Sequence, residues 1–580
     1  MTEEQSDLVA TLHRRASEWY ERNGLPTDAI RHALAAEDFA RAADLVELAW
    51  PAMRRSRQDT AVLGWLKALP DELVRIRPVL SVGYAHVLLA GGELEGVEDR
   101  LRDAERWLDT TPDMRERPEA PSPEMVVVDE VGFRRLPGAI ALARAGRALV
   151  LGDVPETVTY ALRALDLAPE DDHLGRGGAE ALLGLAYWAS GDLEKAHQTY
   201  ADGMAYVQSA GNISDAINGT VARADIRIAQ GRLREAMSAY ERGLRLATEQ
   251  GGPVLRGTAD LHVGVSELHR ERNDLTSATE HLLTSEELGE HTGFPQCPYR
   301  RRMAMARIRE AQGDLDAAVE LLDEAERLYA GDFFPNVRPV AAVRTRVWVK
   351  QVRQGEAGGW ARELNLSVED DLSYLREFEY ITLARLLLAQ YRSDRANRSI
   401  LEPMRLLERL LTAAEQGGRT GSAIEILALQ ALAHQGQGDI PATLMPLERA
   451  LTMAEPEGYV RIFVDEGAPM AQLLLEAAAS GITPDYTSKL LAAFGAEQPR
   501  SAGESPLPAS PASQPLIEPL SKRELDVLWL LQTELSGPEI ARELVVALST
   551  VRTHTKSIYS KLGVNNRRSA VRRAAELGLL

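Results

Sequence analysis

Residues 519–580 read PLSKRELDVLWLLQTELSGPEIARELVVALSTVRTHTKSIYSKLGVNNRRSAVRRAAELGLL, and their pattern predicts four short helices. Ser521 with Glu524, and Ser536 with Glu539, have the Ser-x-x-Glu spacing of a capping box. In a capping box the hydroxyl accepts from the first-turn backbone, while the carboxylate accepts from the N–H of the capping residue. The stretch therefore predicts a small all-helical unit.

The second and third of these helices are separated by a short turn. We expect the second helix over 536–544, with Pro538 in its first turn, where a missing N–H costs nothing. The third is expected over 549–562, and Gly563 after it suits a left-handed stop. Two helices joined by a turn of this length predict a helix-turn-helix.

The third helix has two faces. The residues expected to reach the core recur at helical spacing: Val551, Ile558 and Leu562. On another face, Arg552 and Lys556 can donate to O6 and N7 of guanine, and the methyl group of Thr553 can touch a thymine methyl. Further positive charge, suited to holding phosphates, follows in the fourth helix: Arg567, Arg568, Arg572 and Arg573.

Four motifs in this order resemble the LuxR-type helix-turn-helix family. They are E-x-x-V-L at 524–528, EIA at 539–541, TVR-x-H at 550–554 and IYSKLGV at 558–564. The resemblance implies that the third helix enters the major groove of double-stranded DNA and that the fourth pairs two domains as a homodimer. The DNA-binding residues that we expect are Ser549, Thr550, Arg552, Thr553, His554, Lys556, Lys561, Arg567 and Arg568.

One position departs from the family pattern. Ala547 stands where the family usually has a serine that caps the recognition helix. Either Ser549 or Thr550 caps the helix instead, or the cap is weak at a cost of about 1 kcal/mol.

Charge is divided unevenly along the chain. The 580 residues carry a formal charge of −20, yet the stretch from Ile517 onward is positive. Ten Lys and Arg there face seven Asp and Glu, which leaves the rest at −23. The basic function is therefore confined to the carboxyl-terminal end, and the acidic remainder is expected to stay off DNA.

A recurring phrase runs through the acidic part. Examples are SGDLEKA at 190–196, QGRLREA at 230–236 and QGDLDAA at 312–318. The glycine or asparagine positions 152, 191, 231, 273 and 313 are 39 to 42 residues apart. A period near forty with two helices per unit predicts a solenoid of helical hairpins, in which Gly ends one helix and Asp begins the next. These pairs resemble tetratricopeptide (TPR) repeats.

Two further stretches, 12–48 and 455–474, resemble the MalT-type large LuxR regulators. They read LHRRASEWYERNGLPTDAIRHALAAEDFARAADLVEL and EPEGYVRIFVDEGAPMAQLL. In that family a P-loop NTPase and a winged helix precede a helical sensor array. This chain has no G-x-x-x-x-G-K-[ST] motif, so no nucleotide or other cofactor is expected. A natural shortening and a start assigned too far downstream both stay open.

The sequence has no recognisable enzyme or metal site. It lacks HExxH, paired cysteines and G-x-S-x-G, so we expect neither catalysis nor a metal. The single Cys297 is expected to be a packing residue, as are three tryptophans: Trp19, Trp65 and Trp188. Neither a signal peptide nor a membrane span is recognisable, which favours the cytoplasm.

Together these patterns predict an all-α chain with four parts: helical repeats over 1–135, a TPR-like sensor array over 136–496, a flexible linker over 497–517 and the LuxR-type domain over 518–580. Within this scheme, prolines between 110 and 138 predict a surface loop.

The predicted function is sequence-specific transcription regulation, with activation favoured, RNA polymerase as a partner and an unknown small-molecule or protein effector bound by the array. The alternatives are a TPR-like interaction scaffold and a truncated partner of a full-length regulator.

Overall fold

The protein is helical throughout the part that the computed structural model describes, and no strand occurs there. The chain divides into two compact units, Met1–Pro499 and Arg500–Leu580. The predicted all-α class is confirmed. The described residues are 3–55, 58–108, 125–249, 254–289, 292–329, 331, 333–497, 520–533, 535–544, 546–562, 564 and 567–576.

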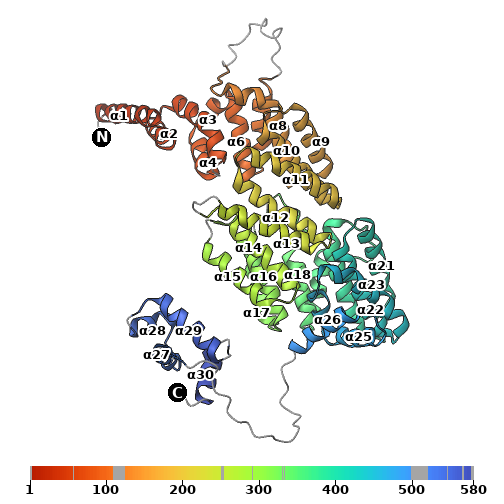
Figure 1. Cartoon of the computed structure of the whole chain (residues 1–580). Coiled ribbons are helices and arrows are strands. Elements are labelled where there is room, and N and C mark those ends of the chain that lie inside the picture. Colours follow the sequence, from red (N-terminus) through yellow and green to blue (C-terminus); the bar gives the residue numbers. More distant parts are fainter. Residues whose placement is uncertain are drawn as a thin grey trace. The chain divides into compact units, whose positions relative to one another are not determined.

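The amino-terminal helices of the first unit share a core of their own (Figure 1). They are α1 (Glu3–Arg22), α2 (Pro26–Ala35), α3 (Phe39–Arg55), α4 (Asp59–Ala68), α5 (Asp71–Arg75), α6 (Pro78–Ala90) and α7 (Val97–Glu105). Trp65 packs against this core, but Trp19 on α1 is 56% exposed. The expectation that Trp19 is a core residue is therefore wrong, because α1 packs mainly against α2.

Paired helices joined by tight turns form the middle of the first unit (Figure 1). They are α8 (Glu130–Val150), α9 (Val154–Leu167), α10 (His173–Ser190), α11 (Leu193–Ser209), α12 (Ile213–Ala229), α13 (Leu233–Glu249), α14 (Thr258–Glu271), α15 (Leu275–Leu288), α16 (Cys297–Ala311), α17 (Leu315–Arg327), α18 (Val340–Lys350) and α19 (Gln354–Glu363).

The tight turns match the recurring phrase. The residues with positive φ, between 65° and 87°, are Gly152, Gly191, Gly231, Asn273 and Gly313. At four of these turns the next residue is an Asp whose side chain accepts from the N–H three positions on, for example at 2.9 Å for Asp153 and 3.0 Å for Asp274. At the fifth turn the next residue is Arg232, which offers no acceptor. A left-handed residue thus ends one helix and the next helix begins within two positions, which confirms the predicted hairpins.

Helix α8 begins earlier than the prolines predict. The interpretation of 110–138 as a surface loop is wrong for its last nine residues, which are helical. Asp129 caps the helix, and Leu136 is buried in the amino-terminal core. This packing outweighs the hydrogen bond that Pro137 cannot donate inside the helix. Residues 109–124 lie outside the described part.

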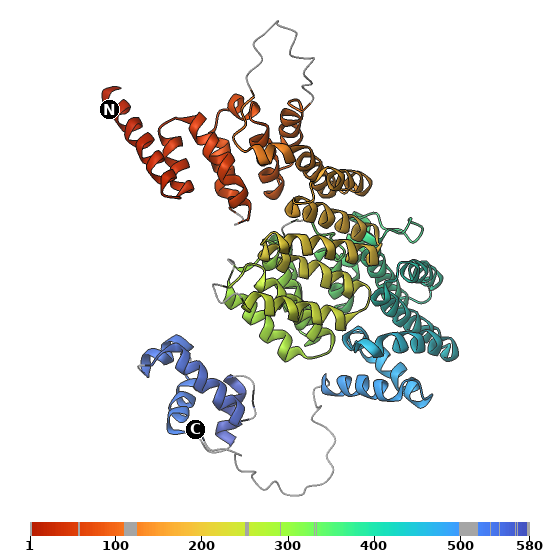
Figure 2. The ribbon, with the colours of Figure 1, turned by 45° about the horizontal axis from the view of Figure 1, so that its top comes forward.

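The later helices of the first unit lie beside the earlier pairs (Figure 2). They are η3 (Tyr374–Arg376), α20 (Glu377–Ser393), α21 (Leu401–Gln416), α22 (Thr420–Gln437), α23 (Ile440–Ala454), η4 (Glu455–Glu457), α24 (Arg461–Val464), α25 (Ala468–Ala479) and α26 (Pro484–Glu497).

Three turns of the array contact this later segment directly. A Cβ at Gly231 would lie 2.8 Å from the Cβ of Thr420, so the missing side chain is what permits the approach. Gly191 is packed in the same way against η3. At the third turn, Arg461 donates to the Oδ1 of Asn273 over 3.0 Å. The later segment therefore closes the array along its row of turns.

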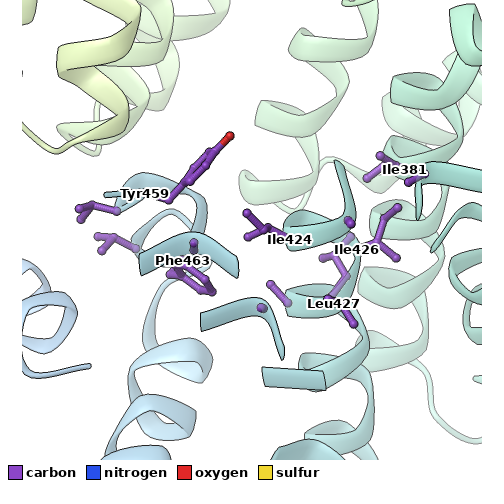
Figure 3. Packing of buried hydrophobic residues seen from close by; sticks show 14 of the residues in the cluster. Ile381, Ile424, Ile426, Leu427, Tyr459 and Phe463 are labelled. Atoms are coloured by element: carbon purple, nitrogen blue, oxygen red, sulfur yellow. The ribbon is translucent and has the colours of Figure 1, made fainter. Parts of the chain in front are cut away.

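An extensive hydrophobic cluster holds this closed part together (Figure 3). Helices α20, α22 and α24 contribute Ile381, Ile424 and Phe463, each at most 2% exposed. Full burial of such a side chain stabilises the fold by about 1.5–3 kcal/mol. The array is therefore fastened by apolar packing as well as by polar contacts at its turns.

The second unit contains the four expected helices: α27 (Lys522–Leu531), α28 (Gly537–Glu543), α29 (Leu548–Leu562) and α30 (Arg567–Glu576). The backbone N–H of Ser521 donates to Glu524 over 2.7 Å, as the capping box predicts. At the second box, Glu539 accepts from the N–H and hydroxyl of Ser536. Gly563 and the predicted linker from residue 498 onward lie outside the described residues.

Candidate nucleic-acid interface

Helix α29 packs one face into the second unit. Val551, Ile558 and Leu562 are 0–5% exposed, which confirms the predicted core face. They meet a cluster to which α27 and α28 also contribute, including Leu528 and Ile540. This packing fixes the rotation of α29 about its axis and so determines which side chains point outward.

The opposite face of α29 carries the predicted base-reading residues. Arg552, Thr553 and Lys556 are exposed, while Thr550 and His554 are half-buried. Neither Arg552 nor Lys556 has an ion-pair partner in the described part of the chain. Their charges are therefore available to phosphates or to base edges, which is the chemistry that major-groove reading requires.

Two expected DNA contacts have intramolecular partners instead. The Nζ of Lys561 lies 3.0 Å from a carboxylate oxygen of Glu524. Arg567 donates to the backbone carbonyls of Leu531 over 2.9 Å and Leu535 over 2.6 Å. Lys561 thus joins α29 to α27, and Arg567 holds the connection between α27 and α28. Sequence spacing could not show these partners because they lie on α27 or in the connection that follows it.

Glu524 links the start of α27 to α29. Its carboxylate accepts from the N–H of Ser521, from the hydroxyl of Ser557 and from Lys561. Burial opposes its charge, but these three donors together lower the pKa of Glu524 to about 2. The capping role was predicted, whereas the link to α29 was not. The sequence signal for this link is that Ser557 and Lys561 are four residues apart, so both lie on the same side of α29 and can reach one carboxylate.

Ala547 takes the capping position of α29. Its carbonyl accepts from the N–H groups of Thr550 and Val551 over 3.0 and 3.3 Å. Its methyl side chain offers no acceptor to the first turn. Thr550 and Ser549 already lie inside the helix, so neither replaces the missing cap. The side chains of Ser549 and Arg568 lie outside the described part.

A second candidate site is a cavity of about 440 Å³ inside the first unit. It lies between the earlier helices α14, α16 and α18 and the later helices α20 and α22. Glu425 forms ion pairs there with Arg346 and Arg385, both at 2.8 Å. Burial opposes the charge on Glu425, but these two arginines lower its pKa to about 2. Sequence reasoning proposed the array and named no residue of this cavity.

Within the described ranges, no three His, Cys, Asp or Glu residues are placed to hold a metal ion. Cys297 is 4% exposed and packs in a small apolar cluster, as predicted. Burial raises the pKa of its thiol to about 12. None of the described helices has the length and apolar character that a bilayer crossing needs.

Two known proteins with similar sequences are HTH-type transcriptional regulators. The HTH-type transcriptional regulator MalT of Cronobacter sakazakii is 26% identical over 603 residues, which covers 99% of this chain and 62% of that protein. MalT of Serratia proteamaculans is 25% identical, covering 98% of this chain and 61% of that protein. The chain therefore spans about three fifths of the length of these relatives.

One solved structure and two family models also align with this chain. A Rap protein solved with competence and sporulation factor aligns with 67% of this chain and 99% of its own, at 11% identity and a TM-score of 0.44. Residues 518–574 match the model of bacterial regulatory proteins of the luxR family. Residues 138–480 match the model of the MalT-like TPR region. Because that second match covers more than half of the sequence, the chain belongs to the family of proteins with a MalT-like TPR region.

Proposed function

We propose that this protein is a cytoplasmic, sequence-specific regulator of transcription whose second unit reads DNA through α29. The observation that carries the proposal is the outer face of that helix. Arg552 and Lys556 are exposed there without an ion-pair partner among the described residues, and Thr553 lies between them. One short helix reaches few bases, so we propose that two copies bind paired half-sites as a homodimer.

The first unit is proposed to sense a signal and to pass it to transcription, with activation through RNA polymerase as the favoured outcome. Its cavity supports this role because earlier and later helices of the array both line it. A small molecule bound there touches both sides of the closed array. Binding therefore changes the stability of the closed form, which is what a sensor requires.

DNA selection tests the reading role. Genomic fragments are selected on the full chain near physiological salt, with the double variant Arg552→Ala/Lys556→Ala in parallel. The control, Lys522→Ala/Arg523→Ala, removes the same charge from α27, where both side chains are exposed. We expect the native chain and the control to enrich one repeated motif, and the α29 variant to lose it.

A different result would disprove sequence reading. If all three proteins enrich the same DNA without a motif and with a steep salt dependence, the binding is only to phosphates. If none enriches DNA, the second unit does not act alone.

A second candidate function is a protein-interaction scaffold, and one observation favours it. Helix α1 exposes three apolar side chains, Leu8, Leu12 and Trp19, each more than half exposed. Such a patch marks protein contacts more often than isolated surface leucines do. Loss of partner capture by Leu12→Ser/Trp19→Ser, together with failure of DNA selection, would support the scaffold.

A further inference from the structure

The cavity of the first unit is lined by charged groups that are almost all paired. Each carboxylate that lines it takes part in an ion pair; examples are Glu267 with Arg307 at 3.1 Å and Glu310 with Lys350 at 2.7 Å. A buried carboxylate is stable when its charge is compensated in this way. The acidic groups of the cavity therefore need no further cation.

Two lining arginines have no carboxylate partner in the part of the chain that the structure describes. They are Arg338, just before α18, and Arg392 near the end of α20. Both are solvent-accessible, and the guanidinium of Arg338 lies 6.0 Å from the ring centre of Phe378. The lining residues include seven Lys and Arg and seven Asp and Glu, and Arg338 and Arg392 are the positive charges among them that form no ion pair with a described residue.

Arg338 acts on groups on both sides of the cavity. Burial raises the pKa of the Tyr459 hydroxyl, and the charge of Arg338 opposes that rise. The same charge helps Arg346 and Arg385 to lower the pKa of Glu425. Arg338 therefore lies within electrostatic reach of both the α22 and the α24 side of the cavity.

The Tyr459 hydroxyl is a further group without a partner. The residue is 5% exposed, and no hydrogen bond of its hydroxyl occurs among the described residues. Figure 3 shows its ring at the edge of the apolar cluster, with the oxygen pointing away from Phe463. Tyr459 lines the cavity, so its hydroxyl can donate a hydrogen bond to an acceptor bound there.

We propose that this cavity binds a small effector through an anionic group, a phosphate ester or a carboxylate, which pairs with Arg338 and accepts from the Tyr459 hydroxyl. Arg392 supplies a second positive charge to the ligand. The volume of about 440 Å³ lies within the range of small-molecule sites. An arginine fork donates two parallel hydrogen bonds to either kind of anion. The inference rests on the sensing role proposed above and adds the chemical class of the ligand.

Calorimetric titration of the full chain, without DNA, tests the proposal. The probes are inorganic phosphate, glucose 6-phosphate and citrate at millimolar concentration, with glucose as the uncharged match of the second. Glucose 6-phosphate and citrate separate a phosphate ester from a carboxylate. We expect at least one anion to bind at one per chain, and glucose not to bind.

Three variants locate the binding. Arg338→Gln removes the charge and is expected to weaken binding by about tenfold to a hundredfold. Tyr459→Phe removes only the hydroxyl and keeps the ring in the apolar cluster, so we expect a smaller loss. Arg398→Gln is the control, because Arg398 is exposed and does not line the cavity.

The proposal is overturned if none of the anions binds, if glucose binds as tightly as its phosphate ester, or if Arg338→Gln leaves the affinity unchanged. DNA selection is measured separately on Arg338→Gln, which is expected to keep the DNA motif. Anion binding without DNA selection would disprove the proposed function alone, and the reverse result would disprove this inference alone.

Discussion

Replacing Glu524 with glutamine tests how the DNA-reading helix is held. The pKa of Glu524 is about 2, against an ordinary value of 4.5. Since one pKa unit corresponds to 1.36 kcal/mol, the charge contributes about 3 kcal/mol to the stability of the second unit at neutral pH. That is a large share of the stability of a domain of this size. We therefore expect Glu524→Gln to lower the free energy of unfolding by about 2–3 kcal/mol.

The pH dependence has a defined sign. The pKa is lowered in the folded state, so the contribution is present in full above about pH 4.5 and is lost as the pH falls toward 2. The difference between the native chain and Glu524→Gln should shrink over that interval. The pH change therefore alters the free energy of unfolding of the second unit and leaves the base-reading side chains of α29 unchanged.

Peptide-resolved hydrogen exchange on the full chain is the assay, because it reads α27 and α29 apart from the first unit. Glu539→Gln is the matched control, since among the described residues Glu539 forms hydrogen bonds only with Ser536, the capping residue of its own helix. Protection of α29 should fall strongly in Glu524→Gln and little in the control. Equal loss in both variants, or a Glu524→Gln deficit that stays constant down to about pH 3, would refute the reasoning.

Three more predictions concern single positions. Ala547→Ser supplies the missing cap of α29 and should stabilise the second unit by about 1 kcal/mol in the same exchange measurement, which unchanged protection of α29 would contradict. Gly231→Ala should lower the melting temperature more than Gly211→Ala, because both have φ near 80° but only Gly231 is packed against α22; equal shifts would show that the contact contributes nothing. Arg461→Met should lower the free energy of urea unfolding by about 1–3 kcal/mol, because it removes one of the two guanidinium groups that pair with half-buried Asp465 while Arg270 remains; an unchanged free energy would argue against that role.

Short-range sequence patterns predicted the helices of the second unit and the helical hairpins of the first. The caps at Ser521 and Ser536 and the turns at the repeated glycines depend on residues a few positions apart, and each lies where its pattern indicates. The expected inward face of α29 is also confirmed. The base-reading role of Arg552 and Lys556 stays a prediction, since no DNA is present to test it.

Long-range contacts account for what the sequence could not show. Lys561 and Arg567 are basic residues whose partners lie 32 to 37 positions away, so charge alone suggested DNA. The cavity joins helices whose lining residues run from Ile228 to Glu466, and no local pattern brings them together. The loop predicted over 110–138 extended too far, because the burial of Leu136 and its neighbours keeps residues 130–138 helical.

The contacts across the row of turns have a consequence for how the array can change length. In an open solenoid each unit touches only its neighbours, so whole repeats can be gained or lost. Here Gly231 meets Thr420, and Asn273 meets Arg461 188 positions along the chain. Inserting or deleting one repeat among the earlier helices would move these turns away from the residues that they contact in the later segment. The number of repeats in this part of the chain is therefore fixed, because the turns of the earlier helices must match their contact residues in the later segment.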